Sequence, residues 1–221
     1  MIDASLQSRA AVHAALGDPL RLAIVDELVV ADRTASELRL LFGIESNLAA
    51  HHIRVLEEAG LLERTVSDGD RRRRYLRLRR TDVDVGRPEA IGVGGVVFVC
   101  THNSARSHLA AALWNRTSPV RATSAGTHPA DAVHPRAVVA ADAVGLDLHG
   151  AVPTRFDPAE VDGLVITVCD RAHEEFRNTG FRELHWSVPD PARDGRQPAF
   201  HAAVAAIAER VDTVVPLVAA P

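Results

Sequence analysis

Residues 94–107 read GGVVFVCTHNSARS, an apolar run that stops at Cys100 and passes through a short polar loop into a helical pattern. The Cys-x5-Arg spacing lets such a loop fold around a tetrahedral oxyanion, because successive backbone N–H groups and the helix start point inward while Arg106 supplies a bidentate fork. The same positive field stabilises the Cys100 thiolate, which is the nucleophilic form of the side chain. The stretch therefore predicts a cysteine nucleophile held in an oxyanion-binding loop.

From this stretch to the end of the chain, apolar runs alternate with helical patterns. The expected strands are 96–100, 121–125, 163–168 and 184–187, and the expected helices are 106–116, 135–145 and 198–213. Alternation of this kind is typical of a parallel sheet that is covered by helices. We therefore expect a three-layer α/β domain with a central parallel sheet over residues 95–221.

The N-terminal part has a different pattern, which is helical up to about residue 60. Two helix-start signals occur in it. Asp18 can cap a helix that has Pro19 at its first position, and residues 34–37 (TASE) have the spacing of a capping box. A further helix over residues 46–59 is expected to end at Gly60, where a left-handed conformation suits glycine.

A charged hairpin follows these helices. Residues 61–66 and 74–79 alternate apolar and charged positions, which predicts two paired strands. Short helices followed by such a hairpin predict an α+β winged helix-turn-helix domain over residues 1–82. Residues 83–94 contain a proline and glycines without periodicity, so we place the interdomain linker there. The chain is expected to be multidomain, and its 221 residues suffice for two compact units.

Composition excludes several classes of protein. Hydrophobic residues make up 47% and charged residues 24%, which is ordinary for globular proteins and argues against long disordered segments. No run of about 18 apolar residues occurs, and the first residues, MIDAS, carry an acid where a secretory signal has a basic region. Two cysteines are too few for a disulfide framework. We therefore expect a cytoplasmic protein with no membrane partner.

The helix expected over residues 46–59 would be the recognition helix, which enters the major groove of double-stranded DNA. Its outward face is expected to carry Ser46, Asn47, Ala50, His51 and Arg54, and the candidates for contacts with base edges are Ser46, Asn47 and His51. The residues expected to pack inward are Leu48, Ile53, Val55 and Leu56. The hairpin adds a positive patch suited to phosphates, formed by Arg64, Arg71, Arg72, Arg73 and Arg74. An arginine run is usually only a solvated face, but its place after a helix-turn-helix pair favours DNA binding.

Three stretches of this domain carry a family resemblance: residues 17–21 (GDPLR), 34–38 (TASEL) and 50–62 (AHHIRVLEEAGLL). They resemble the helices and turn of ArsR-type repressors, and the resemblance covers roughly residues 4–80. It implies a transcriptional regulator that binds an operator in double-stranded DNA. It also implies a homodimer formed through the first and last helices of the domain, so that two recognition helices meet successive half-sites.

Metal sensing is not expected in this domain. Members of that family that sense metals or arsenite use cysteine thiolates or paired histidine and acid ligands. Residues 1–99 contain no cysteine, and His13, His51 and His52 lack a ligand constellation. We therefore predict no metal site.

The second domain carries three further stretches of this kind: residues 100–107, residues 123–127 (TSAGT) and Asp190-Pro191. They resemble the low-molecular-weight tyrosine phosphatases and the arsenate reductases that share their fold, over about residues 95–215. The resemblance implies that Cys100 is the nucleophile, that Arg106 binds the oxyanion and that Asp190 protonates the leaving oxygen. It also implies a loop for arsenate or a phosphate-like oxyanion, formed by Thr101, His102, Asn103, Ser104 and Ala105 and supported by Asn103, Ser107 and Ser124.

The second cysteine bears on the choice between reductase and phosphatase. Residues 166–170 (ITVCD) resemble the place where thioredoxin-linked arsenate reductases carry a resolving cysteine, which would make Cys169 the thiol that attacks the arsenylated Cys100. Those enzymes commonly have a third cysteine seven positions further on, where this chain has Phe176. A buried structural Cys169 and attack by a low-molecular-weight thiol are the alternatives. The expected partner is an external thiol reductant, thioredoxin or a glutaredoxin-like system, with no bound cofactor.

The aromatic residues favour a small inorganic oxyanion over a phosphotyrosyl side chain. Tyr75 falls in the hairpin, and Trp114 and Trp186 fall on elements that are expected to pack, which leaves few aromatic walls for a deep pocket. The preferred hypothesis is a DNA-binding transcriptional regulator fused to a cysteine-dependent arsenate reductase acting in arsenic resistance. The alternatives are a DNA-tethered low-molecular-weight protein tyrosine phosphatase and a non-catalytic oxyanion or redox sensor that controls DNA binding.

Overall fold

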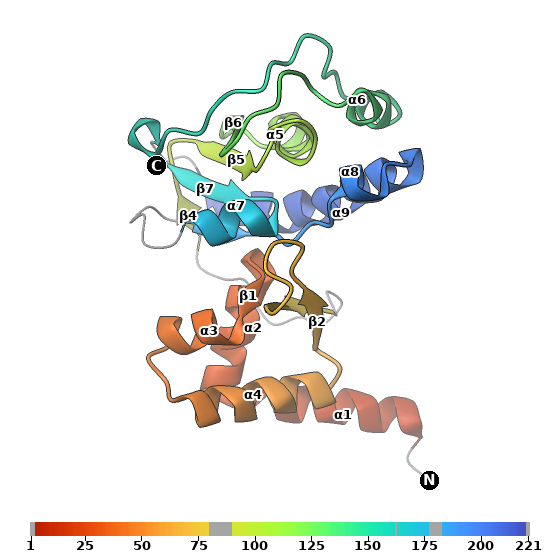
Figure 1. Cartoon of the computed structure of the whole chain (residues 1–221). Helices are drawn as coiled ribbons and strands as arrows, with labels where there is room; N and C mark the ends of the chain where they lie inside the picture. Colours follow the sequence, from red (N-terminus) through yellow and green to blue (C-terminus); the bar gives the residue numbers. More distant parts are fainter. Residues whose placement is uncertain (1–2, 80–89, 162, 177–182, 220–221) are drawn as a thin grey trace. The chain divides into compact units, whose positions relative to one another are not determined.

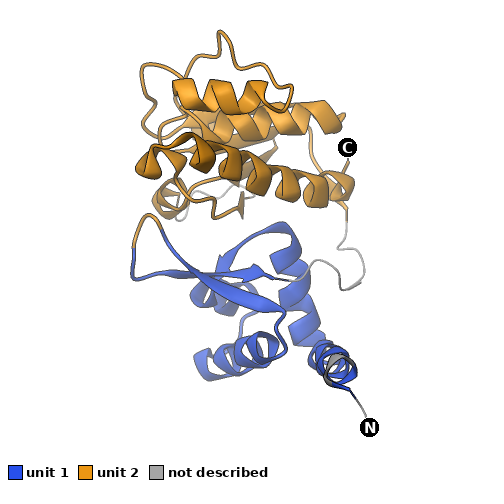
Figure 2. Ribbon diagram, turned by 90° about the vertical axis from the view of Figure 1, so that its right-hand side faces the viewer, with its two compact units in different colours: residues 1–67, 71–88 blue, residues 68–70, 89–221 orange. Residues whose placement is uncertain are grey.

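The computed structural model describes residues 3–79, 90–161, 163–176 and 183–219. The chain forms two compact units, one made of residues 1–67 and 71–88 and the other of residues 68–70 and 89–221 (Figure 2). Each unit has its own elements and its own core. Within the described residues, no helix is both long enough and apolar enough to cross a membrane.

The first unit is built from short helices and a small antiparallel sheet (Figure 1). Its elements are α1 (Ala4–Leu16), α2 (Pro19–Val30), β1 (Arg33–Thr34), α3 (Ala35–Leu41), α4 (Ser46–Glu58), β2 (Leu62–Val66) and β3 (Arg74–Leu78). The strands are antiparallel in the order β1-β3-β2. The core brings Ile24 and Leu28 of α2 against Ile53 and Leu56 of α4, all fully buried. The helix-turn-helix and the charged hairpin are confirmed.

The helix starts in this unit follow the local sequence. Asp18 accepts a hydrogen bond from the Arg21 backbone N–H at 2.9 Å, and Pro19 occupies the first helical position. The capping box is complete, because the Glu37 N–H donates to Thr34 Oγ1 at 3.2 Å and the Thr34 N–H donates to Glu37 Oε2 at 2.6 Å. Gly60 has a φ of 73°, the left-handed conformation expected after α4.

The second unit is an α/β domain. Its main elements are β5 (Val96–Cys100), α5 (Arg106–Thr117), β6 (Ala122–Gly126), α6 (Pro135–Asp142), β7 (Leu164–Thr167), α7 (Asp170–Glu175), β8 (Glu183–His185), α8 (Pro191–Asp194) and α9 (Gln197–Val214). The four strands are all parallel, in the order β6-β5-β7-β8. This confirms the predicted parallel sheet. Figure 1 shows α5 beside β5 and β6, with α6 and α9 packed near it.

Large aromatic rings fill the core of this unit. The Phe98 ring centroid lies 5.6 Å from that of Trp114 and 5.5 Å from that of Trp186, and all three side chains are fully buried. The Trp114 indole N–H donates to the Val120 carbonyl at 2.8 Å, so its polar atom is satisfied. Both tryptophans therefore belong to the packed interior, and Tyr75 lies buried in β3 of the first unit.

Short elements depart from the sequence expectations. The helices α7 and α8 were not expected, because six and four residues are too few for helical periodicity to register. Two residues within the expected linker 83–94 form β4 (Ile91–Gly92), which pairs in parallel with β9 (Val218–Ala219). Positions 83–89 of that linker lie outside the described residues.

Candidate active site and nucleic-acid interface

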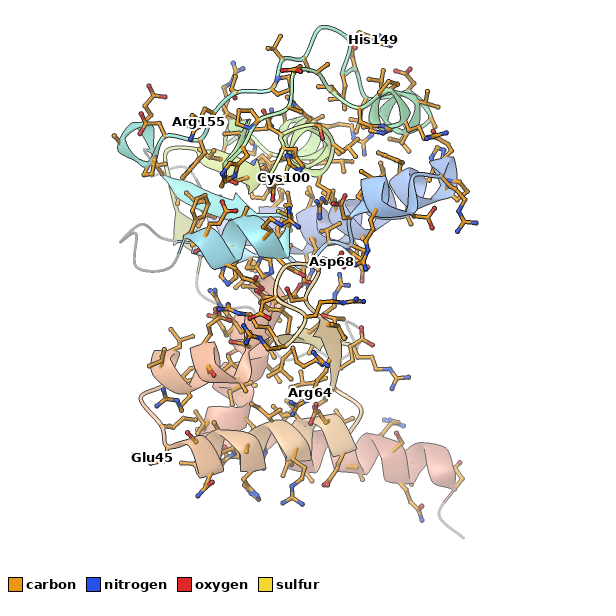
Figure 3. The ribbon with its side chains drawn as sticks, in the orientation of Figure 1. Glu45, Arg64, Asp68, Cys100, His149 and Arg155 are labelled. Atoms are coloured by element: carbon orange, nitrogen blue, oxygen red, sulfur yellow. The ribbon has the colours of Figure 1, made fainter. Side chains whose placement is uncertain are left out.

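The site residues of the second unit lie at the carboxyl ends of the strands of the parallel sheet. Cys100 is the last residue of β5, Gly126 is the last residue of β6, and Cys169 and Asp190 follow β7 and β8. The chain leaves β5 towards β6 on one side, whereas β7 lies on the other side of β5. Loops that leave neighbouring strands in opposite directions open a crevice at their carboxyl ends, where ligands bind in α/β folds. Figure 3 shows Cys100 where β5 gives way to this loop region.

The thiol of Cys100 is surrounded by hydrogen-bond donors. Its side chain is buried, and its Sγ lies 3.2 Å from the Asn103 backbone N and 3.1 Å from Ser107 Oγ. Among the described residues, Asn103 is the one non-glycine residue with a positive φ, 45°. That conformation turns the loop back, so that the Asn103 N–H points at the sulfur. The helix α5 begins at Arg106, so its N-terminal backbone dipole also favours negative charge beside the loop.

The guanidinium of Arg106 is held in place on two sides. Its Nη1 donates to the Val188 carbonyl at 2.9 Å, and its Nη2 lies 3.2 Å from Asp190 Oδ2. Burial works to lower the pKa of Arg106, but the negative charges of the nearby thiolates and carboxylates outweigh it and raise the pKa above its ordinary value. Arg106 therefore stays charged although its side chain is only 8% exposed.

The acid expected from the sequence lies directly beside this arginine. Asp190 is the N-cap of α8, where its Oδ1 accepts from the Ala192 N–H at 3.1 Å. Its other oxygen, Oδ2, faces Arg106, and the side chain is 33% exposed. Asp190 is thus fixed by one oxygen and directed into the site by the other.

The loop is supported by an amide that bridges two hydroxyls. The Asn103 Nδ2 donates to Ser107 Oγ at 2.8 Å and to Ser124 Oγ at 3.0 Å, while its Oδ1 accepts from the Thr154 N–H at 2.8 Å. The structure therefore brings together the three residues expected to support the loop. Thr154 was missed, because it approaches from a loop with no motif of its own.

The rest of the loop is anchored by its backbone. The carbonyls of Thr101, His102 and Ser104 accept from the N–H groups of His128, Ala130 and His134 at 2.8 to 2.9 Å. The buried Ala105 occupies the N-cap position of α5, without a side-chain hydrogen bond to the first turn. The exposed ring of His102 contacts the His128 carbonyl through Nδ1 at 3.1 Å.

Close packing against β6 also fixes the loop. A Cβ atom added at Gly126 would lie 2.9 Å from the backbone N and the Cβ of Asn103 and from the Thr101 carbonyl oxygen. These distances are shorter than van der Waals contact, so only glycine lets the end of β6 approach the loop this closely. The glycine of the TSAGT stretch is therefore required by the position of the loop.

The second thiol lies against the same loop. Cys169 is buried at the N-cap of α7, and its Sγ accepts from the Thr101 N–H at 3.2 Å and lies 3.3 Å from Thr101 Oγ1. Burial raises the pKa of the Cys169 thiol, and the charge of Arg106 acts in the opposite direction. The position seven residues further on holds Phe176, whose ring packs on Phe156 with centroids 4.7 Å apart.

A cleft opens over these groups. Its lining includes Thr101, Arg106, Cys169, Asp170 and Asp190. None of the lining residues in the described part of the chain is a phenylalanine, tyrosine or tryptophan. A polar cleft with a buried cation suits a small anion better than an aromatic ring.

A buried polar network lies behind the cleft. The Oδ1 of Asp170 lies 3.1 Å from His185 Nε2, and the rings of His185 and His173 stack with centroids 4.2 Å apart. Burial works to raise the pKa of Asp170, but the hydrogen bond and the charge of His185 outweigh it, so the pKa is lowered. Asp170 is therefore a carboxylate held by its partners, and no motif in the sequence indicated this network.

The recognition helix of the first unit presents a polar face. The exposed residues on α4 include Ser46, Asn47, Ala50, His51 and Arg54, as expected from the sequence. The side chains of His52, Ile53 and Leu56 are buried on the opposite face. The prediction for Leu48 was wrong, because this side chain is 44% exposed near the start of the helix.

The basic residues of the hairpin differ in their contacts and in their exposure. Arg64 pairs with Glu57 of α4, with its Nη2 at 3.1 Å from Oε2, and the hydrogen bond to Glu57 raises its pKa. The side chains of Arg71, Arg72 and Arg74 are exposed on the hairpin, and that of Arg73 is half-buried. Arg74 Nη1 donates to the Arg71 carbonyl at 2.6 Å, which ties this arginine to the turn.

A pocket of about 170 Å³ lies beside the recognition helix. Its lining includes Ser36 and Arg39 of α3, Ser46 and Ala50 of α4, and Arg64. Figure 3 shows Glu45 at the start of α4, where its side chain makes no capping hydrogen bond to the first turn. Hydroxyls, guanidinium groups and a helix start are groups that bind phosphate. Sequence reasoning missed Arg39, which stands outside the recognition helix and the hairpin.

Comparisons with known proteins agree with this division of the chain. Residues 95–219 match the family described as low molecular weight phosphotyrosine protein phosphatase, and residues 16–65 match a helix-turn-helix domain. Among solved structures, an arsenate reductase from Archaeoglobus fulgidus DSM 4304 is 28% identical, with a TM-score of 0.47 over 55% of this chain and 98% of that chain. The tyrosine phosphatase Wzb from Escherichia coli K30 is 22% identical, with a TM-score of 0.51 over 56% of this chain and 97% of that chain. The tyrosine phosphatase AmsI from Erwinia amylovora is 21% identical, with a TM-score of 0.50 over 56% of this chain and 92% of that chain.

Proposed function

The chain belongs to the low molecular weight phosphotyrosine protein phosphatase family through residues 95–219, and from this premise we propose that its second unit is a thiol-dependent arsenate reductase with Cys100 as the nucleophile. One observation carries the choice of reductase. Cys169 Sγ lies within hydrogen-bond distance of Thr101, the residue directly after Cys100, so a second thiol borders the loop that holds the first. A hydrolytic phosphatase needs no second thiol.

The first step uses the groups around Cys100. Its thiolate attacks the arsenic of arsenate, so that an S–As bond forms while an As–O bond breaks. Asp190 gives a proton to the departing oxygen, which leaves as water, and Arg106 with the loop N–H groups balances the charge on the remaining oxygens. Hydrogen bonds from Asn103 and Ser107 stabilise the thiolate before the attack.

The second step uses Cys169. Its thiolate attacks Cys100 Sγ, an S–S bond forms, the S–As bond breaks, and the electron pair stays on arsenic, which leaves as arsenite. Two thiols are thereby oxidised to a disulfide while arsenic is reduced from the pentavalent to the trivalent state. An external thiol reductant, thioredoxin or a glutaredoxin-like system, then restores both thiols. Because burial raises the pKa of the Cys169 thiol, this thiol must lose its proton before it attacks Cys100 Sγ.

The first unit has a helix-turn-helix domain, and we propose that it is an ArsR-type transcriptional regulator. The polar face of α4 would meet base edges in the major groove, and the exposed arginines of the hairpin would meet phosphates. Two copies of the chain would bind successive half-sites as a homodimer. Regulator and reductase in one chain would serve arsenic resistance in the cytoplasm.

The test is arsenate reduction by the purified full chain, supplied separately with thioredoxin and with a low-molecular-weight thiol and glutaredoxin. Cys100→Ser should abolish turnover with both systems. Cys169→Ser should abolish turnover with thioredoxin while Cys100 still reacts with an alkylating reagent, so each cysteine serves as the control for the other.

A phosphatase is the second candidate, because the matched family is described by that activity. Hydrolysis of para-nitrophenyl phosphate by the same preparations measures it. Strong hydrolysis that survives Cys169→Ser, without arsenate turnover in either thiol system, would replace the reductase by a phosphatase.

A further inference from the structure

A histidine inside the second unit has no role in the chemistry described so far. His108 follows Ser107 in α5, and its side chain is 91% buried, since the residue is only 9% exposed. Its Nδ1 lies 3.0 Å from Ser124 Oγ. Its other ring nitrogen, Nε2, is buried and has no hydrogen-bond partner among the described residues. A leucine at this place would avoid burying an unpaired polar atom, so packing alone does not account for a histidine.

His108 stands at the end of a continuous hydrogen-bond chain that starts at the nucleophile. Cys100 Sγ lies 3.1 Å from Ser107 Oγ, and Asn103 Nδ2 joins Ser107 Oγ to Ser124 Oγ at 2.8 and 3.0 Å. Ser124 Oγ then meets His108 Nδ1. The side chains of Asn103 and Ser107 are fully buried, so water does not compete for these bonds.

The Asn103 amide, in the middle of this series of hydrogen bonds, decides which atoms donate and which accept. Asn103 Oδ1 accepts from the Thr154 backbone N–H, which can only donate, so the Asn103 amide nitrogen must face the two serines. Each serine oxygen therefore accepts from Asn103 and keeps its own hydrogen to donate. When Cys100 is a thiolate, the Ser107 hydroxyl is the donor to Cys100 Sγ, and when His108 Nδ1 carries no proton, the Ser124 hydroxyl is the donor to that nitrogen.

We propose that His108 is a positioning residue, whose neutral ring accepts the Ser124 hydroxyl and thereby fixes Asn103 and Ser107 as the pair that donates to the Cys100 thiolate. The inference rests on the proposed function only in taking Cys100 as the nucleophile. Without an acceptor at position 108, the Ser124 hydroxyl can turn towards Asn103, the amide loses one of its two acceptors, and Ser107 is no longer held as a donor to the sulfur.

The surroundings of His108 keep its ring neutral. Burial lowers the pKa of His108. The hydrogen-bonding influence of the Asn103 backbone raises this pKa, but by less. A neutral imidazole has one accepting nitrogen, whereas a charged one has none. The ring therefore offers the acceptor that the Ser124 hydroxyl needs at neutral pH.

The experiment measures the pH profile of Cys100 ionisation in the full chain with Cys169→Ser, which leaves one thiol. Alkylation by iodoacetamide is followed over pH, and the midpoint is read instead of the rate, because nucleophilicity also changes with thiol basicity. His108→Leu should move the midpoint up by roughly one pH unit, a tenfold loss of thiolate, the size of a lost hydrogen bond to a charged group. His108→Gln keeps an acceptor at this position, so the midpoint of this variant should lie close to the wild-type midpoint.

Two further variants separate positioning from packing. His149→Leu is the matched control, because this ring is 70% exposed at its side chain and pairs with Asp142 instead of the loop, and it should leave the midpoint unchanged. Ser124→Ala should shift the midpoint as far as His108→Leu does. Because both substitutions act through the same series of hydrogen bonds, the double variant should shift the midpoint no further than either single variant does.

An unchanged midpoint in His108→Leu, or additive shifts in the double variant, would overturn the proposal. Circular dichroism of each variant reports its fold, and if His108→Leu fails to fold, His108→Gln and Ser124→Ala carry the same comparison. The measurement contains no arsenate. A protein that lacks reductase activity can therefore still support the positioning role, and an active reductase with an unmoved midpoint overturns that role alone.

Discussion

The loop after β5 and the outer face of α4 are both rich in polar side chains, yet they use them in opposite ways. In the loop, Asn103 and Ser107 are fully buried and bond to each other, to Cys100 and to Ser124. On α4, Ser46 and Asn47 are exposed, and the His51 ring contacts Arg54 at 3.4 Å and the ring of its neighbour His52. A buried network holds its groups ready for a small anion, whereas an exposed face stays solvated until a large partner displaces the water.

The largest effect is expected from Arg106→Lys. A lysine cannot bond the Val188 carbonyl, pair with Asp190 and offer a planar fork to an oxyanion at once. Turnover should fall by roughly 10²- to 10³-fold, as for other losses of a donor to a developing charge. Steady-state kinetics with arsenate measures it. Arg116→Lys is the control on the same helix, since its exposed Nη1 bonds the Val144 carbonyl at 2.9 Å, away from the loop. Equal losses of turnover in both variants would mean that the planar guanidinium of Arg106 is not needed to bind the oxyanion.

A smaller effect is expected where β6 approaches the loop. Gly126→Ala places a Cβ 2.9 Å from the Thr101 carbonyl oxygen and from Asn103, so the loop must shift. The free energy of unfolding should fall by about 1–3 kcal/mol, the range for overpacked sites, and turnover should fall with it. Urea unfolding and arsenate kinetics check both. Gly92→Ala is the control, because nothing lies within 4 Å of its added Cβ. A Gly126→Ala protein with wild-type stability and turnover would show that the loop is not held by this contact.

The buried carboxylate behind the cleft gives a pH-dependent prediction. The pKa of Asp170 is lowered from 3.8, so its ionised form stabilises the fold above that pH, and the contribution is lost as the pH falls from 3.8 through the lower pKa of the folded state. Asp170→Asn should therefore lower the free energy of unfolding at pH 7 by about 1–3 kcal/mol, because the hydrogen bond loses its charge. The difference from wild type should shrink below pH 3.8. Denaturant unfolding over a pH series from about 7 down to about 2 measures this, and a difference that is constant with pH would contradict it.

The smallest effect on the fold is expected on α4. Asn47→Ala removes an exposed side chain, so the free energy of unfolding should change by less than about 0.5 kcal/mol. Affinity for a duplex selected from a random pool should fall about tenfold, the lower range for a lost base contact. Arg71→Ala should instead weaken binding to all duplexes alike and reduce the salt dependence by about one phosphate contact. Fluorescence anisotropy at several salt concentrations separates the two, and an Asn47→Ala protein with unchanged affinity would remove this residue from the interface.

The difference between the two regions also explains what the sequence could predict. Some features depend only on residues that are close together in the sequence, so they could be predicted without a structure. They are the capping box at Thr34 and Glu37, the helix end at Gly60 and the loop from Cys100 to Arg106. The parallel sheet followed from the alternation of strands and helices.

What the sequence could not supply depends on chain segments far apart. Thr154 and Val188 reach the loop through backbone atoms, which carry no sequence signal. His108 lies beside a motif residue but gains its partner, Ser124, only when β6 pairs with β5. Leu48 shows the reverse error, because apolar spacing on α4 predicted a buried side chain that is in fact exposed.

The proposed reductase is tested most directly by a single turnover with arsenate and no external reductant, followed by mass spectrometry of the alkylated peptides. We expect one arsenite per chain and a disulfide between Cys100 and Cys169, with neither product in Cys100→Ser. Two free thiols and no arsenite after exposure to arsenate, in a preparation that hydrolyses para-nitrophenyl phosphate, would contradict it.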